Sequence, residues 1–247
     1  DIARILALRD PVRVVTGFDR PNLRFEVLTP QNKEPVLLSL VKARAGKSGI
    51  VYCSTRRDVE KICRMLQDHG VAATRYHAGL SDEERRENQD DFVYDRCPVI
   101  VATNAFGMGI DKSNVAYVLH YNMPQSMEAY YQEAGRAGRD GSDAECILLY
   151  AASDVRTAKY LITHSVTNDE LTERERRQLM ERDLLRLKQM VGYCKTTACL
   201  RGYILSYFGE AHAEHCGHCG NCEAVVTERD VTTQAKMVLS CVRRIQD

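Results

Sequence analysis

Between about residues 12 and 150, short apolar runs alternate with longer amphipathic segments. Runs such as 49–53 (GIVYC) have the pattern of strands that are buried on both faces. The segment that follows, 56–70, places Val59, Ile62, Cys63 and Leu66 on one helical stripe and ends at a glycine typical of a helix C-terminus. This alternation of strand and helix predicts an α/β fold, with a mostly parallel sheet covered by helices on both faces.

The same pattern predicts the remaining elements of this region. Further strands are expected at 71–79, 97–103, 115–121 and 145–151. A helix is expected from Ser81, because Ser81 and Glu84 have the spacing of a capping box, and another from about Ser126. Open parallel sheets bind ligands at the carboxyl ends of their strands, so we expect functional side chains there.

After about residue 152 the strand pattern stops. Residues 153–164, 173–194 and 199–209 have helical periodicity, which predicts a second, helical unit. A short linker, 223–230, leads to an amphipathic helix over 231–245. We therefore predict a first domain over 1–151, a helical subdomain over 152–224 and the truncated start of a third domain over 225–247.

Composition limits the class of protein. The chain has 247 residues, 44% of them hydrophobic, with a formal net charge of zero, as in globular proteins. No run approaches the roughly 20 apolar residues that a membrane span requires, so we predict no membrane association. A nucleic-acid partner would have to bind a local patch, since the overall charge favours none. The chain lacks a signal peptide and an initiating methionine, and we expect it to be a piece of a longer protein.

The ten cysteines do not indicate a disulfide scaffold, because the chain is long and has no secretory signal. Cys53, Cys63, Cys97 and Cys146 stand singly among apolar residues and are predicted to be buried free thiols. Thiolate usage indicates a reducing compartment. We expect the bacterial cytoplasm, in association with the nucleoid, rather than the nucleus.

One apparent nucleotide motif is misleading. Residues 45–49 (AGKSG) contain the Gly-Lys-Ser of a phosphate loop, but position 41 is Val where that motif requires Gly. A strand, not a helix, is predicted to follow. We interpret Lys47 as a solvated residue and conclude that this chain does not hold a nucleotide by itself.

Two other segments have the chemistry of phosphate recognition. In 101–115, Thr103 and Asn104 can donate to a phosphate, and Gly107 and Gly109 allow a close backbone approach, while Asp111 can accept from a ribose hydroxyl. In 132–141 (QEAGRAGRDG), Arg136 and Arg139 share one face of a helix end, beside small glycines such as Gly135. The simpler alternatives are a flexible glycine-containing loop and a glycine-rich turn with solvated arginines.

The C-terminal half carries a metal-binding pattern. Cys199 lies at a predicted helix, and Cys216, Cys219 and Cys222 form a C-x-x-C-x-x-C cluster. Thiolates at this spacing converge on a tetrahedral metal, which predicts zinc over a redox pair or an iron–sulfur cluster. Four thiolates leave no open position for water, so the zinc is expected to be structural. Cys194, His215 and His218 are alternative candidates for the fourth ligand.

The series GIVYCSTR, YHAGL, VIVATNAFGMGIDK and YYQEAGRAGRDG closely resembles motifs IV to VI of the second motor lobe of superfamily 2 helicases, specifically the RecQ family. The resemblance implies a RecA-like lobe that completes an ATPase with a first lobe. It assigns finger and sensor roles to Arg139 and Arg136, and coupling of nucleotide to DNA to Gln132. ATP with Mg²⁺ would be held jointly with the first lobe, with Gly109, Asp111 and Gly135 on the nucleotide side.

The same resemblance implies that Ser54, His77, Thr103 and Asn104 face one strand of DNA. His77 is equally compatible with an ordinary strand-end histidine. RecQ proteins carry a four-cysteine zinc module whose first cysteine precedes a YFGE stretch, and SYFGE at 206–210 favours Cys199 over Cys194. The family usually has two basic residues after that cysteine, whereas this chain has Leu200 and Arg201.

We therefore expect the C-terminal half of the motor core of a RecQ-like helicase. It would work as a monomer that couples ATP hydrolysis to 3′ to 5′ unwinding at a junction of single strand and duplex. The final helix resembles the start of a winged-helix domain. The alternative is a non-catalytic, zinc-dependent nucleic-acid-binding or scaffold module that has kept a helicase-like lobe, although intact Arg136, Arg139 and Gln132 argue against it.

Overall fold

A single parallel sheet organises the protein, as the alternating sequence pattern predicts. In the computed structural model, which describes residues 5–12, 17–106, 112–164, 172–224 and 230–246, the strand order is β1-β6-β5-β2-β4-β3, and every neighbouring pair is parallel. The strands are β1 (Leu23–Leu28), β2 (Gly49–Tyr52), β3 (Ala73–Tyr76), β4 (Val99–Ala102), β5 (Tyr117–His120) and β6 (Ala144–Leu149).

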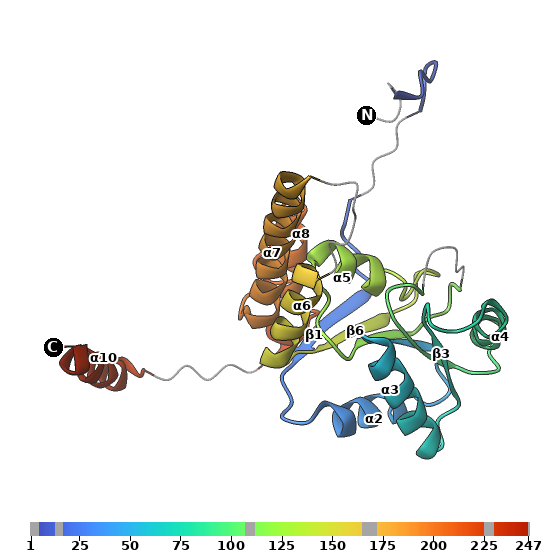
Figure 1. Ribbon diagram of the computed structural model, residues 1–247, viewed down its shortest axis with the longest axis horizontal. Coiled ribbons are helices and arrows are strands. Elements are labelled where there is room, and N and C mark those ends of the chain that lie inside the picture. The colour runs from blue at the N-terminus through green and yellow to red at the C-terminus, as the bar shows by residue number, and fades with distance from the viewer. Residues whose placement is uncertain (1–4, 13–16, 107–111, 165–171, 225–229, 247) are drawn as a thin grey trace.

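Helices cover both faces of this sheet (Figure 1). Successive strand residues point to opposite faces, so Val51 packs in one apolar cluster and its neighbour Ile50 in the other. The Val51 face is covered by α2 (Lys33–Lys42) and α3 (Arg56–Asp68). The Ile50 face is covered by α5 (Met127–Ala134) and the helices that follow β6, while α4 (Asp82–Val93) packs beside β3.

Local sequence signals fix several of these elements. Helix α3 buries the predicted stripe of Val59, Ile62, Cys63 and Leu66. Helix α4 starts with the predicted capping box, in which Ser81 and Glu84 each satisfy the other's backbone N–H. Lys47 is exposed in the turn ahead of β2, as predicted. Cys53, Cys63 and Cys146 are buried, but Cys97 is only half-buried.

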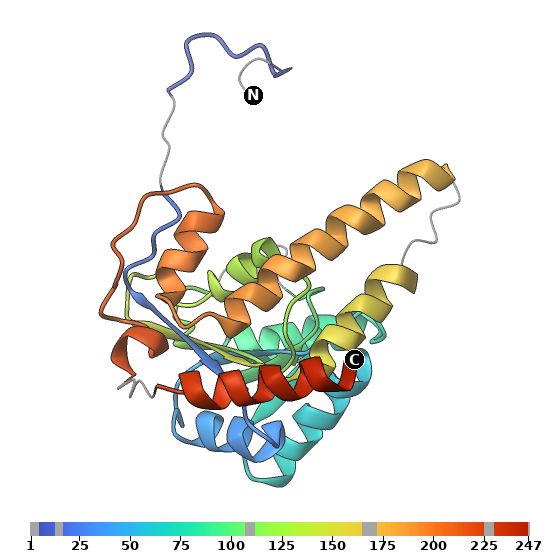
Figure 2. The same ribbon diagram turned by 90° about the vertical axis from the view of Figure 1, so that its left-hand side faces the viewer.

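The C-terminal helices complete the Ile50 face instead of forming a core of their own. They are α6 (Ala152–His164), α7 (Glu173–Lys195), α8 (Leu200–Tyr207) and the short α9 (Gly220–Glu223). Met190 and Ile204 from these helices belong to the same buried cluster as Phe25 of β1. Figure 2 shows α6 and α7 side by side above the sheet.

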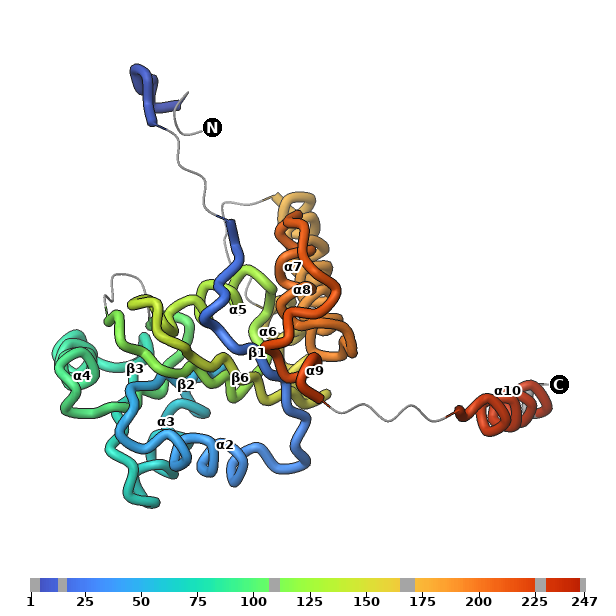
Figure 3. The backbone as a smooth tube through the Cα atoms, turned by 180° about the vertical axis from the view of Figure 1, so that it is seen from behind, coloured from blue at the N-terminus to red at the C-terminus, as the bar shows by residue number. Residues whose placement is uncertain are grey.

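Helix α10 (Thr232–Gln246) stands apart from this body, and its described side chains are exposed (Figures 1 and 3). Its exposed residues include Met237, Val238 and Leu239. In the part of the chain that the structure describes, no helix has the length and apolar character needed to cross a membrane.

Candidate functional site

The two arginines lie on the loop that joins α5 to β6, residues 135–143. Because this loop enters β6, it lies at the amino ends of the strands, not at the carboxyl edge where ligands were expected. The backbone N–H of Gly138 donates to Val115 O at 2.9 Å, and that of Asp140 donates to Ser113 O at 3.3 Å. These bonds fix the loop against the chain that leads into β5.

Arg136 and Arg139 are brought together. Both line one small cavity with Phe106 and Lys112. Arg136 is half-buried and Arg139 is exposed. Burial raises the pKa of Tyr52 well above its ordinary value, while the positive charges of Arg136 and Arg139 act to lower it. The loop therefore presents a cationic pair beside an aromatic wall.

The neighbouring predicted residues are placed as follows. Gln132 is exposed on the last turn of α5, and Gly135 caps that helix with an ordinary helical φ of −65°. Gly138 has a φ of +55°, and a Cβ there would lie 2.5 Å from Asn22 Nδ2, so this position requires glycine. Gly107, Gly109 and Asp111 lie outside the described residues.

The carboxyl edge of the sheet carries a pocket of about 460 Å³, lined by both polar and apolar side chains. Ser54, after β2, and Asn104, after β4, line it together. Thr103 is buried, and its N–H donates to Tyr76 O at 3.1 Å, so its backbone serves the sheet. Arg186 of α7 lines the pocket from the helical side.

The His77 side chain does not face this pocket. It is only 5% exposed, its Nδ1 accepts from the N–H of Gly79 at 3.1 Å, and its Nε2 lies 2.9 Å from Glu60 Oε1. Both ring nitrogens are thus occupied within the protein. This geometry favours the ordinary structural histidine over a direct DNA contact.

Sequence reasoning missed polar residues that follow β5. Asn122 Oδ1 accepts from the N–H of Ser54 at 3.0 Å, which fixes the loop after β2. His120 is fully buried, with Nε2 2.9 Å from Glu133 Oε2 on α5. Asn122, His120 and Glu133 all line the pocket. For Asn122 and His120 the available signal was their position directly after or at the end of a buried strand, the rule already applied to Asn104, whereas Glu133 lies on α5 and has no such signal.

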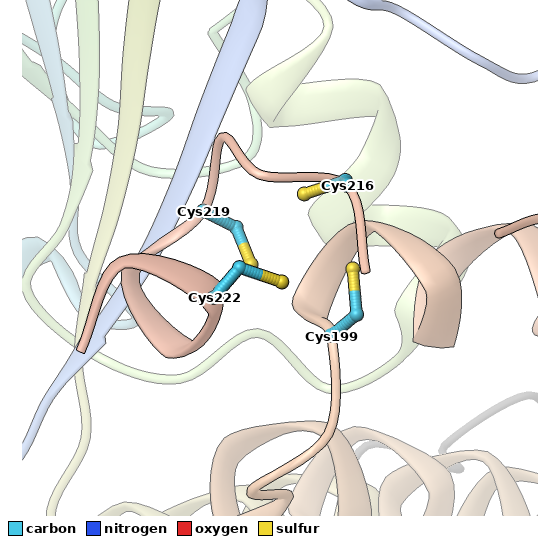
Figure 4. A group of neighbouring side chains, drawn as sticks. All are labelled: Cys199, Cys216, Cys219 and Cys222. Atoms are coloured by element: carbon cyan, nitrogen blue, oxygen red, sulfur yellow. The ribbon is translucent and has the colours of Figure 1, made fainter. Parts of the chain in front are cut away.

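The four predicted cysteines converge. Figure 4 shows Cys199 at the start of α8, Cys216 and Cys219 on the loop that precedes α9, and Cys222 on α9. Their sulfur atoms are directed toward one another. All four Sγ atoms lie within 4.8 Å of one another. A zinc ion with Zn–S distances of about 2.3 Å would place tetrahedral sulfurs about 3.8 Å apart, so the group fits the metal with small movements.

Backbone amides prepare these sulfurs for a metal. The N–H of Gly202 donates to Cys199 Sγ at 3.3 Å, and that of His218 donates to Cys216 Sγ at 3.4 Å. Burial acts to raise the pKa of the Cys219 thiol, but donors including the N–H of Cys222 outweigh it and lower this pKa to about 7. Burial raises the pKa of Cys216 to about 12. A bound cation would deprotonate such thiols.

The alternative fourth ligands are not part of this group, although His215 Nδ1 lies 3.9 Å from Cys222 Sγ. Among the described residues, the four cysteines form the one cluster whose ligand atoms could hold a metal ion. Cys194 is buried within α7, and His218 Nδ1 lies 3.8 Å from Glu223 Oε1. The sequence departs from the family pattern at Leu200, which is buried, whereas the basic Arg201 beside it is only 7% exposed and donates hydrogen bonds to the chain ahead of β1.

Comparisons with known proteins agree with this geometry. The model of the helicase conserved C-terminal domain matches residues 32–141, and the RecQ zinc-binding model matches residues 152–223. The chain is 45% identical to the ATP-dependent DNA helicase RecQ of Bacillus subtilis over 247 residues, which is 100% of this chain and 40% of that protein. The chain belongs to the RecQ family.

Its RecQ relatives extend to eukaryotes. The ATP-dependent helicase SGS1 of Saccharomyces cerevisiae is 38% identical over 257 residues, covering 100% of this chain and 17% of that protein. The chain thus spans about 40% of the length of the bacterial RecQ and less of the yeast protein. A solved structure of Saccharomyces cerevisiae dbp5 bound to gle1 and IP6 has a TM-score of 0.51 at 21% identity, over 65% of this chain and 46% of that one, which shows a shared fold.

The RecQ zinc-binding match and the cysteine cluster together support a structural zinc ion in this chain. Zinc would be held by Cys199, Cys216, Cys219 and Cys222, and it would link the start of α8 to α9. That ligand set is a prediction which the geometry is able to accommodate.

Proposed function

We propose that this chain is the second motor lobe and zinc module of an ATP-dependent RecQ helicase, and that Arg136 and Arg139 complete its ATPase site. The observation that supports this most is the shared cavity of the two arginines on a loop fixed by backbone hydrogen bonds. Groups held in place before the reaction stabilise developing charge without reorganisation.

The chemistry requires both lobes. Transfer of a phosphoryl group spreads negative charge over its oxygens, and a guanidinium fork matches that charge. ATP with Mg²⁺ would be bound mainly by the first lobe, while Arg139 serves as finger and Arg136 as sensor, and Gly109, Asp111 and Gly135 are also predicted to serve nucleotide binding. Gln132, exposed on the last turn of α5, would couple nucleotide state to DNA.

DNA would bind at the opposite, carboxyl edge of the sheet. Ser54 and Asn104 line the pocket there, and Thr103, the residue before Asn104, would act from the same edge. Contacts of this kind hold a strand without reading its sequence. Closure of the two lobes on ATP would then move the strand in the 3′ to 5′ direction, with the protein acting as a monomer on DNA in the bacterial cytoplasm.

The zinc module would have a structural role. We propose that residues 1–151 form the motor lobe, that 152–224 form the zinc module, and that 225–247 begin a winged-helix domain. Zinc would fix the helical platform that carries this domain. Its own chemistry is that of a cross-link, because four thiolates leave no position for a substrate.

Hydrolysis measurements test the central proposal. DNA-stimulated ATP hydrolysis should be absent with this chain alone and present when a first motor lobe precedes it. In that two-lobe protein, Arg139→Ala should lower kcat by roughly 10³ to 10⁵, the range of arginine fingers, with single-strand DNA binding retained. Arg96→Ala, which removes an exposed arginine paired with Asp91, is the control and should hydrolyse normally. Hydrolysis that survives Arg139→Ala would contradict the assignment.

A further inference from the structure

Residues 18–23, named here the connecting segment, lie between the zinc module and the arginine loop. In Figure 3 the chain that leads into β1 crosses α5, and hydrogen bonds join it to the arginine loop and to Arg201 of α8. The segment is separated in sequence by more than a hundred residues from the side chains and carbonyls that it contacts on either side.

On one side, the segment holds the backbone of the arginine loop. The Arg20 guanidinium donates to Gly138 O at 2.9 Å, to Ala137 O at 3.1 Å and to Gly135 O at 3.5 Å. Asn22 Nδ2 donates to Gly138 O at 2.9 Å and to Ser142 O at 2.8 Å. These carbonyls bracket both Arg136 and Arg139.

On the other side, the zinc module holds the segment. Arg201, two residues after Cys199, donates to Arg20 O and Leu23 O at 2.6 Å and to Pro21 O at 3.2 Å. It also pairs with Asp19 at 2.7 Å. The Phe18 ring stacks on Phe208 at a centroid distance of 4.2 Å. The connecting segment is therefore fixed to the helix that carries the first cysteine of the cluster.

The chemistry of arginine makes this hold specific. A guanidinium is a planar fork of five N–H donors with no acceptor, so several carbonyls must turn toward it at once. Three carbonyls of a single tight loop do so here. Gly138 permits the close approach of Asn22 from the same side. Displacement of a catalytic group by about 1 Å costs on the order of a hundredfold in rate, so a fixed backbone at this loop has a kinetic value.

We propose that Arg20 is a positioning residue for Arg136 and Arg139, and that Arg201 transmits the rigidity of the zinc module to it. This inference rests on the proposed function, because Arg20 would act only through the two arginines that complete the ATPase site. Arg20 itself contacts neither ATP nor DNA in this proposal. Arg20 acts on hydrolysis through the geometry of the arginine loop alone.

The experiment uses the two-lobe protein and a double-mutant cycle. Arg20→Ala should lower kcat for DNA-stimulated ATP hydrolysis by about tenfold to a hundredfold. The KM for ATP should change by less than about threefold, since the lost interaction serves the transition state. In an Arg139→Ala background, Arg20→Ala should remove little further activity, because residues that act as a unit are not additive. Arg20→Lys, which keeps the charge but not the fork, should recover part of kcat.

Arg44→Ala is the matched control. Arg44 forms three hydrogen bonds, two to Glu145 and one to Leu40 O, as many as Arg20 makes to the arginine loop, but it packs beside Tyr117 on the opposite face of the sheet. It should leave kcat near the wild-type value. Zinc content and single-strand DNA binding should be normal in every variant, which separates the effect from unfolding.

Three results overturn the inference. Unchanged kcat in Arg20→Ala, with Arg139→Ala inactive, would refute the positioning role and leave the proposed function intact. An equal loss from Arg20→Ala in both backgrounds would show that Arg20 acts independently of the loop. If Arg139→Ala itself hydrolyses ATP normally, the proposed function fails, and the inference fails with it.

Discussion

The cysteine cluster and the arginine loop are built in opposite ways. All four cysteines come from residues 199–222, and their spacing alone brings three of them together. The arginine loop is held by Arg20, which is 115 to 118 residues away from the carbonyls it contacts. A local pattern therefore specifies the metal site, whereas the geometry of the arginines depends on the complete fold.

The two regions nevertheless meet. Arg201 belongs to the helix that begins after Cys199, and its guanidinium holds the carbonyls of the connecting segment. Burial acts to lower the pKa of Arg201, but Asp19 and the Cys216 sulfur outweigh it and raise this pKa overall. Experiments can therefore test whether the arginine loop depends on the cysteine cluster or only adjoins it.

Loss of one zinc ligand should have the largest effect on stability. Cys219→Ser in this chain should release the metal and lower the free energy of unfolding by more than about 4 kcal/mol, because loss of a structural metal belongs to the few mechanisms of that size. Zinc stoichiometry by elemental analysis and urea unfolding would measure the two effects.

Cys194→Ala provides the control for this change. Cys194 is also buried in the zinc module but lies outside the cluster. Removing its sulfur should cost about 1 to 3 kcal/mol and leave zinc bound at full stoichiometry. Retention of zinc by Cys219→Ser, or its loss from Cys194→Ala, would contradict the ligand set.

Arg201→Gln should have a smaller effect and tests the link between the two regions. The change leaves carbonyls of the connecting segment without their donor, which should cost about 1 to 3 kcal/mol. Zinc should remain bound, while hydrogen exchange accelerates at the Leu23 amide, whose bond to Arg20 O closes the turn of the segment. An unchanged exchange rate at the Leu23 amide would mean that the connecting segment is held without help from the zinc module.

The sequence predicted the parts of the fold that local chemistry controls. The capping box of α4, the buried stripe of α3 and the strands β2 to β6 depend on residues close in sequence. Strand β1 and helices α2 and α9 were not predicted. Strand β1 lies at the edge of the sheet and is only partly buried, so its apolar signal is weak.

The site was predicted unevenly for the same reason. Residue type and spacing indicated the cysteines and the arginines, but not which edge of the sheet each motif would occupy. His77 is a polar residue after a predicted strand, as a DNA-contacting residue would be, and only the fold reveals its partners Glu60 and Gly79. Arg20 and Asn22 carry no local signal of their role, because their partners follow more than a hundred residues later.

The smallest predicted effect concerns a long-range contact that touches neither region. Arg44 and Glu145 join the end of α2 to β6 at 2.7 Å, with the Glu145 side chain 35% exposed. The hydrogen bond from Arg44 lowers the pKa of Glu145 below its ordinary value of 4.5, against the opposing effect of burial. A lowered folded-state pKa stabilises the fold above the unfolded-state pKa and loses this contribution as pH falls through the folded-state value.

Wild type should therefore have a larger free energy of unfolding than Glu145→Gln at neutral pH, and this difference should shrink as pH falls below 4.5. The contribution at pH 7 should be below about 1 kcal/mol, because solvent screens a partly exposed pair. Urea unfolding of both proteins at pH 7 and at low pH would measure it. Protonation of the thiolates would also release zinc in acid, equally in both proteins, so only the difference between them reports on the pair. A difference that does not change with pH would show that the charge of Glu145 does not stabilise the fold through Arg44, and that the long separation of these two residues along the chain does not by itself make their contact matter.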